Sequence, residues 1–74
     1  MYDMYIINDG TPIIRDGDTW TLRGGEVNPD DLIHAIVALE SYVEVQAFRV
    51  NGDIDVIDYV DGKHYHTTRA INRM

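Results

Sequence analysis

The sequence predicts a single small α+β domain, in which an antiparallel sheet of two three-stranded meanders carries one packed helix in the order β-β-β-α-β-β-β. Three observations predict this fold. Dipeptides suited to tight hairpin turns recur along the 74 residues, short runs rich in β-branched and aromatic residues lie between them, and one segment with helix-capping residues separates the two sets. We expect residues 1–74 to form one domain, because a chain of this length buries only one modest core.

The strands are predicted from the turns that separate them. The turn dipeptides are Asp9-Gly10, Asp16-Gly17, Asn51-Gly52 and Asp61-Gly62. Gly, Asn and Asp are typical of such turns because they tolerate positive φ angles. The runs beside the turns predict strands at residues 2–8, 11–16, 19–23, 43–50, 53–60 and 63–69.

The middle of the chain predicts a helix over residues 29–41. Asn28 suits the N-cap and Pro29 suits the first helical position, while the two aspartates that follow complement the helix dipole. The Gly24-Gly25 pair before the cap is expected to be a flexible connection. One stripe of this helix should pack on the sheet, and it carries Leu32, Ile33, Ile36 and Leu39.

Turn geometry also predicts which side chains share a face, because a two-residue loop fixes the register of its strands. Two-residue loops at Asp9-Gly10 and Asp16-Gly17 would leave an odd number of residues between them, so both ends of that strand would bond to the same neighbour. We therefore expect the second loop to shift to Gly17-Asp18 as a type II′ turn, or to carry a bulge. The core face of the first half then carries Met4, Ile6, Ile13, Trp20 and Leu22.

In the second half, two-residue loops at Asn51-Gly52 and Asp61-Gly62 are compatible with each other. They place an apolar set beneath the helix, namely Val43, Val45, Ala47, Ile54, Val56, Val60 and Tyr65. Asp58 falls on the same face, where a buried carboxylate needs a partner. The opposite face mixes rings, acids and imidazoles, as protein interfaces do. We predict it as a partner-binding surface, formed by Glu44, Phe48, Asp55, Tyr59, His64 and His66.

The charge of the chain limits its partners. Thirteen acids and six bases give a net charge of -7. Nine acids and one arginine concentrate a charge of -8 in residues 26–61, whereas residues 62–74 carry +3. An acidic body disfavours direct nucleic-acid binding and favours a protein partner with a basic surface. In size and composition the chain is similar to small acidic inhibitors encoded by phages and mobile elements, and this resemblance implies inhibition, with mimicry of DNA as one route.

No catalytic motif accompanies these features. The chain has no cysteine, no Gly-x-Ser-x-Gly, no phosphate-binding glycine loop and no helical His-Glu pair. The leading hypothesis is a non-enzymatic interaction module, an adaptor or inhibitor without a cofactor. A second hypothesis is metal-dependent activity, because His64 and His66 project from one side of a strand and Asp55 lies diagonal to them. A third is a structural homodimer that covers the apolar sheet faces.

The chain shows no sequence feature of membrane contact. Its longest apolar run, residues 32–39, is interrupted by His34 and is far shorter than the ~20 residues that cross a bilayer. The first four residues lack the positively charged region of a signal peptide. We therefore expect a cytoplasmic protein.

Overall fold

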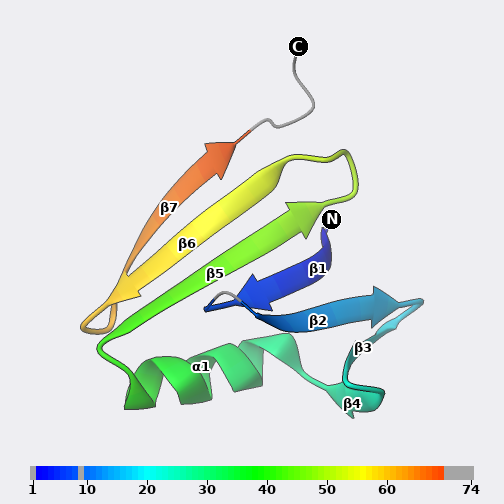
Figure 1. Ribbon diagram of the computed structural model, residues 1–74, viewed down its shortest axis with the longest axis horizontal. Helices are drawn as coiled ribbons and strands as arrows, with labels where there is room; N and C mark the ends of the chain where they lie inside the picture. Colours follow the sequence, from blue (N-terminus) through cyan, green and yellow to red (C-terminus); the bar gives the residue numbers. More distant parts are fainter. Residues whose placement is uncertain (1, 9, 70–74) are drawn as a thin grey trace.

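In the computed structural model, residues 2–8 and 10–69 are described, and they form a seven-stranded antiparallel sheet with one helix (Figure 1). The predicted α+β class is confirmed. The strands follow the order β4-β3-β2-β1-β5-β6-β7, so β1 pairs with β5 and joins the two halves into one sheet. The elements are β1 (Tyr2–Ile7), β2 (Thr11–Asp16), β3 (Thr19–Leu22), β4 (Gly25–Val27), α1 (Pro29–Leu39), β5 (Tyr42–Arg49), β6 (Ile54–Val60) and β7 (Lys63–Arg69).

Strand β4 was not predicted, because the glycine pair before the helix was interpreted as a flexible connection. Leu22 lies opposite Gly25, so Arg23 and Gly24 form a two-residue loop between β3 and β4. Both loop residues have positive φ, 53° and 83°, as a type I′ turn requires. The first half is therefore a four-stranded meander, and the predicted three-stranded one is wrong.

Helix α1 begins as predicted and ends two residues early. The Asn28 side chain accepts hydrogen bonds from the backbone N–H groups of Asp30 (3.0 Å) and Asp31 (3.4 Å), which confirms the N-cap. Ile33 is buried against the sheet, but Leu39 is 86% exposed and does not belong to the packed stripe. Val37 packs against the core instead.

The core lies on one side of the sheet, beneath α1. Its buried residues come from β1, β2, α1 and β5, and they are Ile7, Ile13, Ile33, Val43 and Val45. We refer to this side as the helix face and to the other side as the open face. Figure 1 shows α1 alongside β5 and the first meander, whereas β7 forms the outer edge of the sheet. The helix therefore leaves the outer part of its own face uncovered.

The register of β1 differs from the prediction by one residue. Ile7 lies opposite Thr11, so residues 8–10 form a three-residue connection in place of a two-residue loop. Asn8 has a φ of 45° in this connection, and Asp9 lies outside the described residues. A slip of one residue exchanges the faces of a strand. The prediction for β1 is thus wrong: Ile7 packs under the helix, and Met4 and Ile6 lie on the open face.

The next turn follows the prediction. Asp16 lies opposite Thr19, which leaves Gly17 and Asp18 as a two-residue loop. Gly17 has a φ of 66° whereas Asp18 is not among the positive-φ residues, as a type II′ turn requires. The shifted turn therefore restores the parity of β2.

A second slip occurs between β5 and β6. Phe48 lies opposite Ile54, so the loop that contains Asn51-Gly52 is longer than two residues. The Asp61-Gly62 loop has the predicted two residues, with positive φ at both, 51° and 84°. Consequently the side chains of β6 and β7 lie on the opposite faces from those predicted relative to β5. The predicted grouping of side chains on the two faces is therefore wrong. The helix face carries Asp55, Ile57, Tyr59, His64 and His66, and the open face carries Ile54, Val56, Asp58, Val60 and Tyr65.

Candidate functional site

The predicted partner-binding surface is divided between the two faces of the sheet. Asp55, Tyr59, His64 and His66 stay together on the helix face, because the register between β6 and β7 is the predicted one. The open face carries Glu44 together with Phe48. The longer loop between β5 and β6 causes this division, so each face has to be considered separately.

On the helix face, Asp55 is the centre of a buried polar cluster. Its side chain is fully buried and accepts hydrogen bonds from Tyr2 Oη (2.5 Å), Thr68 Oγ1 (2.7 Å) and Arg49 Nε (2.8 Å). Arg49 Nη2 also lies 2.8 Å from the carboxylate. A β-bulge between Tyr2 and Met4 places Tyr2 on this face. The cluster therefore joins β1, β5, β6 and β7.

These contacts determine the ionisation of Asp55. Burial alone would raise its pKa, but the hydrogen bonds from Tyr2, Thr68 and Arg49 outweigh burial and hold the pKa well below the usual 3.8. The hydrogen bond to Asp55 also raises the pKa of Tyr2 and that of Arg49. Asp55 is thus a carboxylate that is ionised at neutral pH and accepts hydrogen bonds from three side chains. It is suited to holding strands together and unsuited to accepting a proton at neutral pH.

A groove lies beside this cluster, between α1 and the outer strands. It has a volume of about 380 Å³ and is lined by His34 of α1, Ile57 and Tyr59 of β6, and His64 and His66 of β7. We refer to it as the histidine groove, since it contains all three histidines of the chain. A smaller pocket of about 120 Å³ shares three of these residues and extends to two further rings, Tyr2 and Tyr5.

The histidine groove does not form the predicted metal site. Within residues 2–8 and 10–69, no three His, Cys, Asp or Glu side chains are placed to hold a metal ion together. His66 Nε2 lies 3.5 Å from Asp55 Oδ1, but the carboxylate is already bound by its three donors. The His64 ring lies against Tyr59, with 6.1 Å between ring centroids. The predicted ligands share a face without converging on one point.

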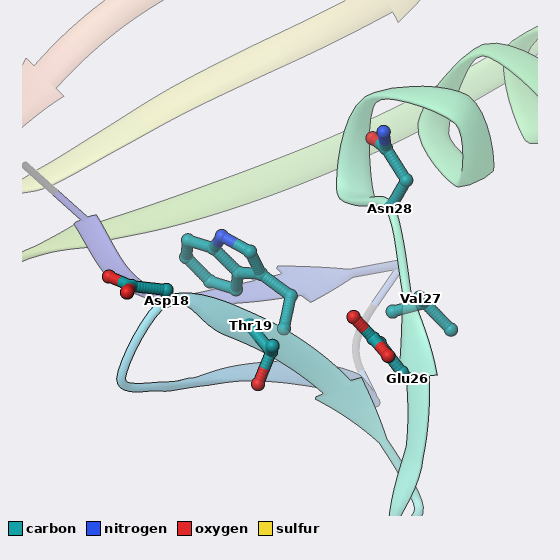
Figure 2. A pocket seen from close by; sticks show the side chains of 6 residues that line it. Asp18, Thr19, Glu26, Val27 and Asn28 are labelled. Carbon is teal, nitrogen blue, oxygen red and sulfur yellow. The ribbon is translucent and has the colours of Figure 1, made fainter.

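Another hollow lies at the opposite end of the helix, beside the edge strand β4. It has a volume of about 440 Å³ and is lined by Asp18, Thr19, Trp20, Glu26, Val27 and Asn28. Figure 2 shows Asp18 on one side of it and Glu26, Val27 and Asn28 on the other. The Asn28 side chain is committed to capping, and Trp20 packs against Tyr5 with 4.8 Å between ring centroids. The hollow contains acids, a ring and the Thr19 hydroxyl, but no imidazole among its lining residues could act as a base for that hydroxyl.

The open face carries apolar side chains on four strands and no helix from the described residues. Pro12 and Ile14 are exposed there, whereas Val56 is buried, with 7% of its surface exposed. Two neighbouring rows of paired residues cross four strands, β2, β1, β5 and β6. We refer to their apolar members as the apolar strip, which consists of Met4, Ile6, Pro12, Ile14, Phe48, Ile54 and Val56. Gln46 interrupts the second row, and its amide donates a hydrogen bond to Glu44 (3.0 Å).

Acidic residues border the apolar strip. Glu44 and Asp58 lie opposite each other, two positions along β5 and β6 from the second row. Tyr42 Oη donates to Asp58 (3.1 Å), and neither carboxylate forms an ion pair with another described residue. On the far side, Asp16 is two positions along β2 from Ile14. The strip is therefore bordered by two acids on one long side and by a single acid, at its β2 end, on the other.

Sequence reasoning missed the partners of Asp55 and most of the apolar strip. The sequence contains a signal for the partners of Asp55. Arg49 is an even number of residues from Val43, Val45 and Ala47, so its side chain lies on the same face of the strand. A basic residue on a buried face needs an acid nearby. Asp55 is the acid near Arg49 on the neighbouring strand β6. The strand register that brings Asp55 and Arg49 together requires the longer loop between β5 and β6.

Comparisons with known proteins give no relative from which a role could be inferred. No protein family, curated protein or solved structure matches the chain. The helix in the described part of the chain is too short and too polar to span a bilayer.

Proposed function

We propose that this protein is a non-enzymatic interaction module, an adaptor or inhibitor, that binds a basic protein partner through the open face of its sheet. The observation that carries this proposal is the position of the exposed apolar side chains. All the exposed large hydrophobic residues that the described strands carry lie on the open face, and they are Ile14, Tyr42, Val60 and Tyr65. Ile14 belongs to the apolar strip, whereas Tyr42, Val60 and Tyr65 lie beside or beyond the pair of Glu44 and Asp58. Exposed apolar side chains that lie beside charged groups are typical of interaction sites.

The charges indicate the chemistry of the partner. Glu44 and Asp58 repel each other across the strand pair, and the whole chain carries a net charge of -7. A partner with basic groups around an apolar centre would relieve this repulsion and be attracted over a distance. Nucleic-acid-binding proteins are one class with such surfaces. A second copy of the chain would bring the same acids to the interface, which disfavours a homodimer through this face.

The helix face gives less support to an enzyme. The most perturbed ionisable group, Asp55, is occupied by three donors and holds no proton to exchange at neutral pH. The histidine groove offers imidazoles and the Tyr59 ring, but no serine, threonine or cysteine is among its lining residues, and no metal-binding set occurs among the described residues. Phe48 and Glu44, the two predicted binding residues on the open face, therefore remain the ones assigned to the partner.

Affinity capture with matched variants tests the assignment of the face. Partners are captured with the wild type, purified, and titrated against two double variants by calorimetry. Ile14→Ser with Tyr65→Ser alters the open face, whereas His64→Ala with His66→Ala alters the histidine groove, and all four side chains are exposed. We expect the open-face variant to bind at least about tenfold more weakly and the groove variant to bind normally.

Salt provides a second readout of the same titration. Attraction between the acidic rim and a basic partner should weaken between low and high salt, because exposed charges are screened. A partner that still binds the open-face variant and is lost from the groove variant would overturn the proposal. So would binding that grows stronger with salt.

A further inference from the structure

We infer that the part of the partner that occupies the open face is a basic amphipathic helix lying across the strands. This inference rests on the proposed function and specifies its ligand. Three features of the described residues support it: the dimensions of the apolar strip, the positions of the acids beside it, and the packing of α1 on the opposite side of the same sheet.

The apolar strip has the proportions of one helix. It crosses four strands, β2, β1, β5 and β6, which spans about 14 Å at the usual strand spacing. Its two rows lie two residues apart along each strand, or about 7 Å. An α-helix rises 1.5 Å per residue, so roughly ten residues cover the length of the strip. The apolar stripe of such a helix, from positions i, i+3, i+4 and i+7, covers a band of comparable width.

The acids lie where the flanks of that helix would pass. Glu44 and Asp58 border one long side of the strip and Asp16 borders the other. A bound helix is about 10–12 Å wide, so it would leave these carboxylates at its edges, within reach of lysine or arginine side chains. A second sheet packed face to face would instead cover Glu44 and Asp58, which have no described cation, and burying them would be unfavourable.

The opposite side of the sheet already carries one helix, which runs close to the direction of β5 (Figure 1). Helix α1 packs Ile33 against Ile7, Ile13 and Val45, which belong to three of the strands that form the strip. A partner helix on the open face would complete a helix, sheet and helix arrangement, one of the stable layered architectures. Gln46, the polar member of the second row, donates one hydrogen bond to Glu44, and its remaining amide groups can bond to a polar group of the partner helix.

Selection from peptide libraries tests this inference on the full chain. The first library holds 14-residue peptides with apolar residues at helical spacing and lysine or arginine elsewhere. The second has the same composition in strict alternation, as in a strand, and the third keeps the helical spacing with glutamate and aspartate. We expect only the first library to be enriched on the immobilised wild type, and its peptides to shift amide NMR signals of the strip residues.

Matched charge variants sharpen the test. Glu44→Gln with Asp58→Asn removes two charges from the rim, and Asp18→Asn with Asp31→Asn removes two exposed charges elsewhere. We expect the selected peptides to bind the rim variant at least about fivefold more weakly at low salt, and the control variant within about twofold of the wild type. An equal loss of peptide affinity in both variants would overturn the inference, because the acids beside the strip would then contribute no more to binding than acids elsewhere.

The libraries also separate this inference from the proposed function. Enrichment of the alternating library would contradict a helical ligand and leave the proposed interaction module unaffected. The same conclusion would follow if no library were enriched while a captured partner still required Ile14 and Tyr65 for binding. Helical peptides that shift only signals from the histidine groove would overturn the inference as well. A captured partner indifferent to the open face contradicts the proposed function itself.

Discussion

Tyr2 donates a hydrogen bond to Asp55 over 2.5 Å, although 53 positions separate the two residues in the sequence. Tyr2 begins β1 and Asp55 lies in β6, on the far side of β5. Arg49 and Thr68 bind the same carboxylate from β5 and β7. This one side chain therefore connects the N-terminal strand to the whole of the second meander.

Replacing Asp55 by Asn should lower the free energy of unfolding by about 3 kcal/mol, near the lower end for breaking a buried ion pair, because Arg49 is 37% exposed and can turn to water. Thr68→Val removes one of the hydrogen bonds and should cost about 1–3 kcal/mol. Urea unfolding followed by circular dichroism measures both. Asp31→Asn, at an exposed position in the first turn of α1, should lose only its interaction with the helix dipole, about 0.3–1 kcal/mol. Equal stability of the Asp55 and Asp31 variants would contradict the structural role of Asp55.

The low pKa of Asp55 predicts how stability responds to acid. Because the folded-state pKa lies below that of the unfolded chain, roughly 3.9, the contacts of the carboxylate contribute fully above about pH 5. They are lost progressively as the pH falls through 4 and below. The difference in unfolding free energy between wild type and Asp55→Asn should therefore shrink from pH 6 to pH 3. Parallel stability curves over this range would show that the pKa is not depressed.

The register of β1 is tested by two neighbouring isoleucines. Ile7 is 2% exposed beneath the helix, so Ile7→Ala should destabilise the fold by about 2–5 kcal/mol. Ile6 lies on the open face and is partly exposed, so Ile6→Ala should cost about 1 kcal/mol. Chemical denaturation of the two variants measures the contrast. The two-residue loop predicted from the sequence requires the reverse order.

Two glycines in or beside turns should respond differently to alanine. Gly17 has a φ of 66°, where a side chain is strained, so Gly17→Ala should cost about 1 kcal/mol or more. Gly25, which follows the Arg23-Gly24 turn, is not among the positive-φ residues, and a Cβ there would be in ordinary contact with Leu22 O at 3.6 Å, so Gly25→Ala should be neutral or stabilise by up to about 1 kcal/mol. Thermal unfolding of both variants gives the comparison. A more stable Gly17→Ala protein would contradict the type II′ turn.

Much of the fold could be predicted because its signals are local. Residue types and turn dipeptides placed six strands within a residue or two, and Asn28 fixed the start of the helix. Parity located the turn at Gly17-Asp18. Each of these follows from a few adjacent residues, so no distant contact was needed to predict them.

The faces could not be predicted as reliably, because one extra loop residue exchanges them. Asn8 and Gly52 adopt positive φ in the longer loops, and nothing in the dipeptides distinguishes these loops from two-residue turns. The consequence was visible nonetheless. The predicted register placed Asp58 under the helix without a partner, whereas the observed one places Asp55 there with three. The requirement that a buried carboxylate has hydrogen-bond partners therefore predicts the strand register better than the turn dipeptides do.

The pairing of β1 with β5 has a consequence for the kinetics of folding. Short connections link the consecutive strands from β1 to β4 and from β5 to β7. Each meander can therefore form from contacts between residues that are close in the sequence. Pairing β1 with β5, which we call the seam, instead requires closing a long loop that contains α1, because Ile7 pairs with Val45. We therefore expect seam formation to limit the refolding rate, and the edge strands β4 and β7 to exchange their amide hydrogens well before the seam does.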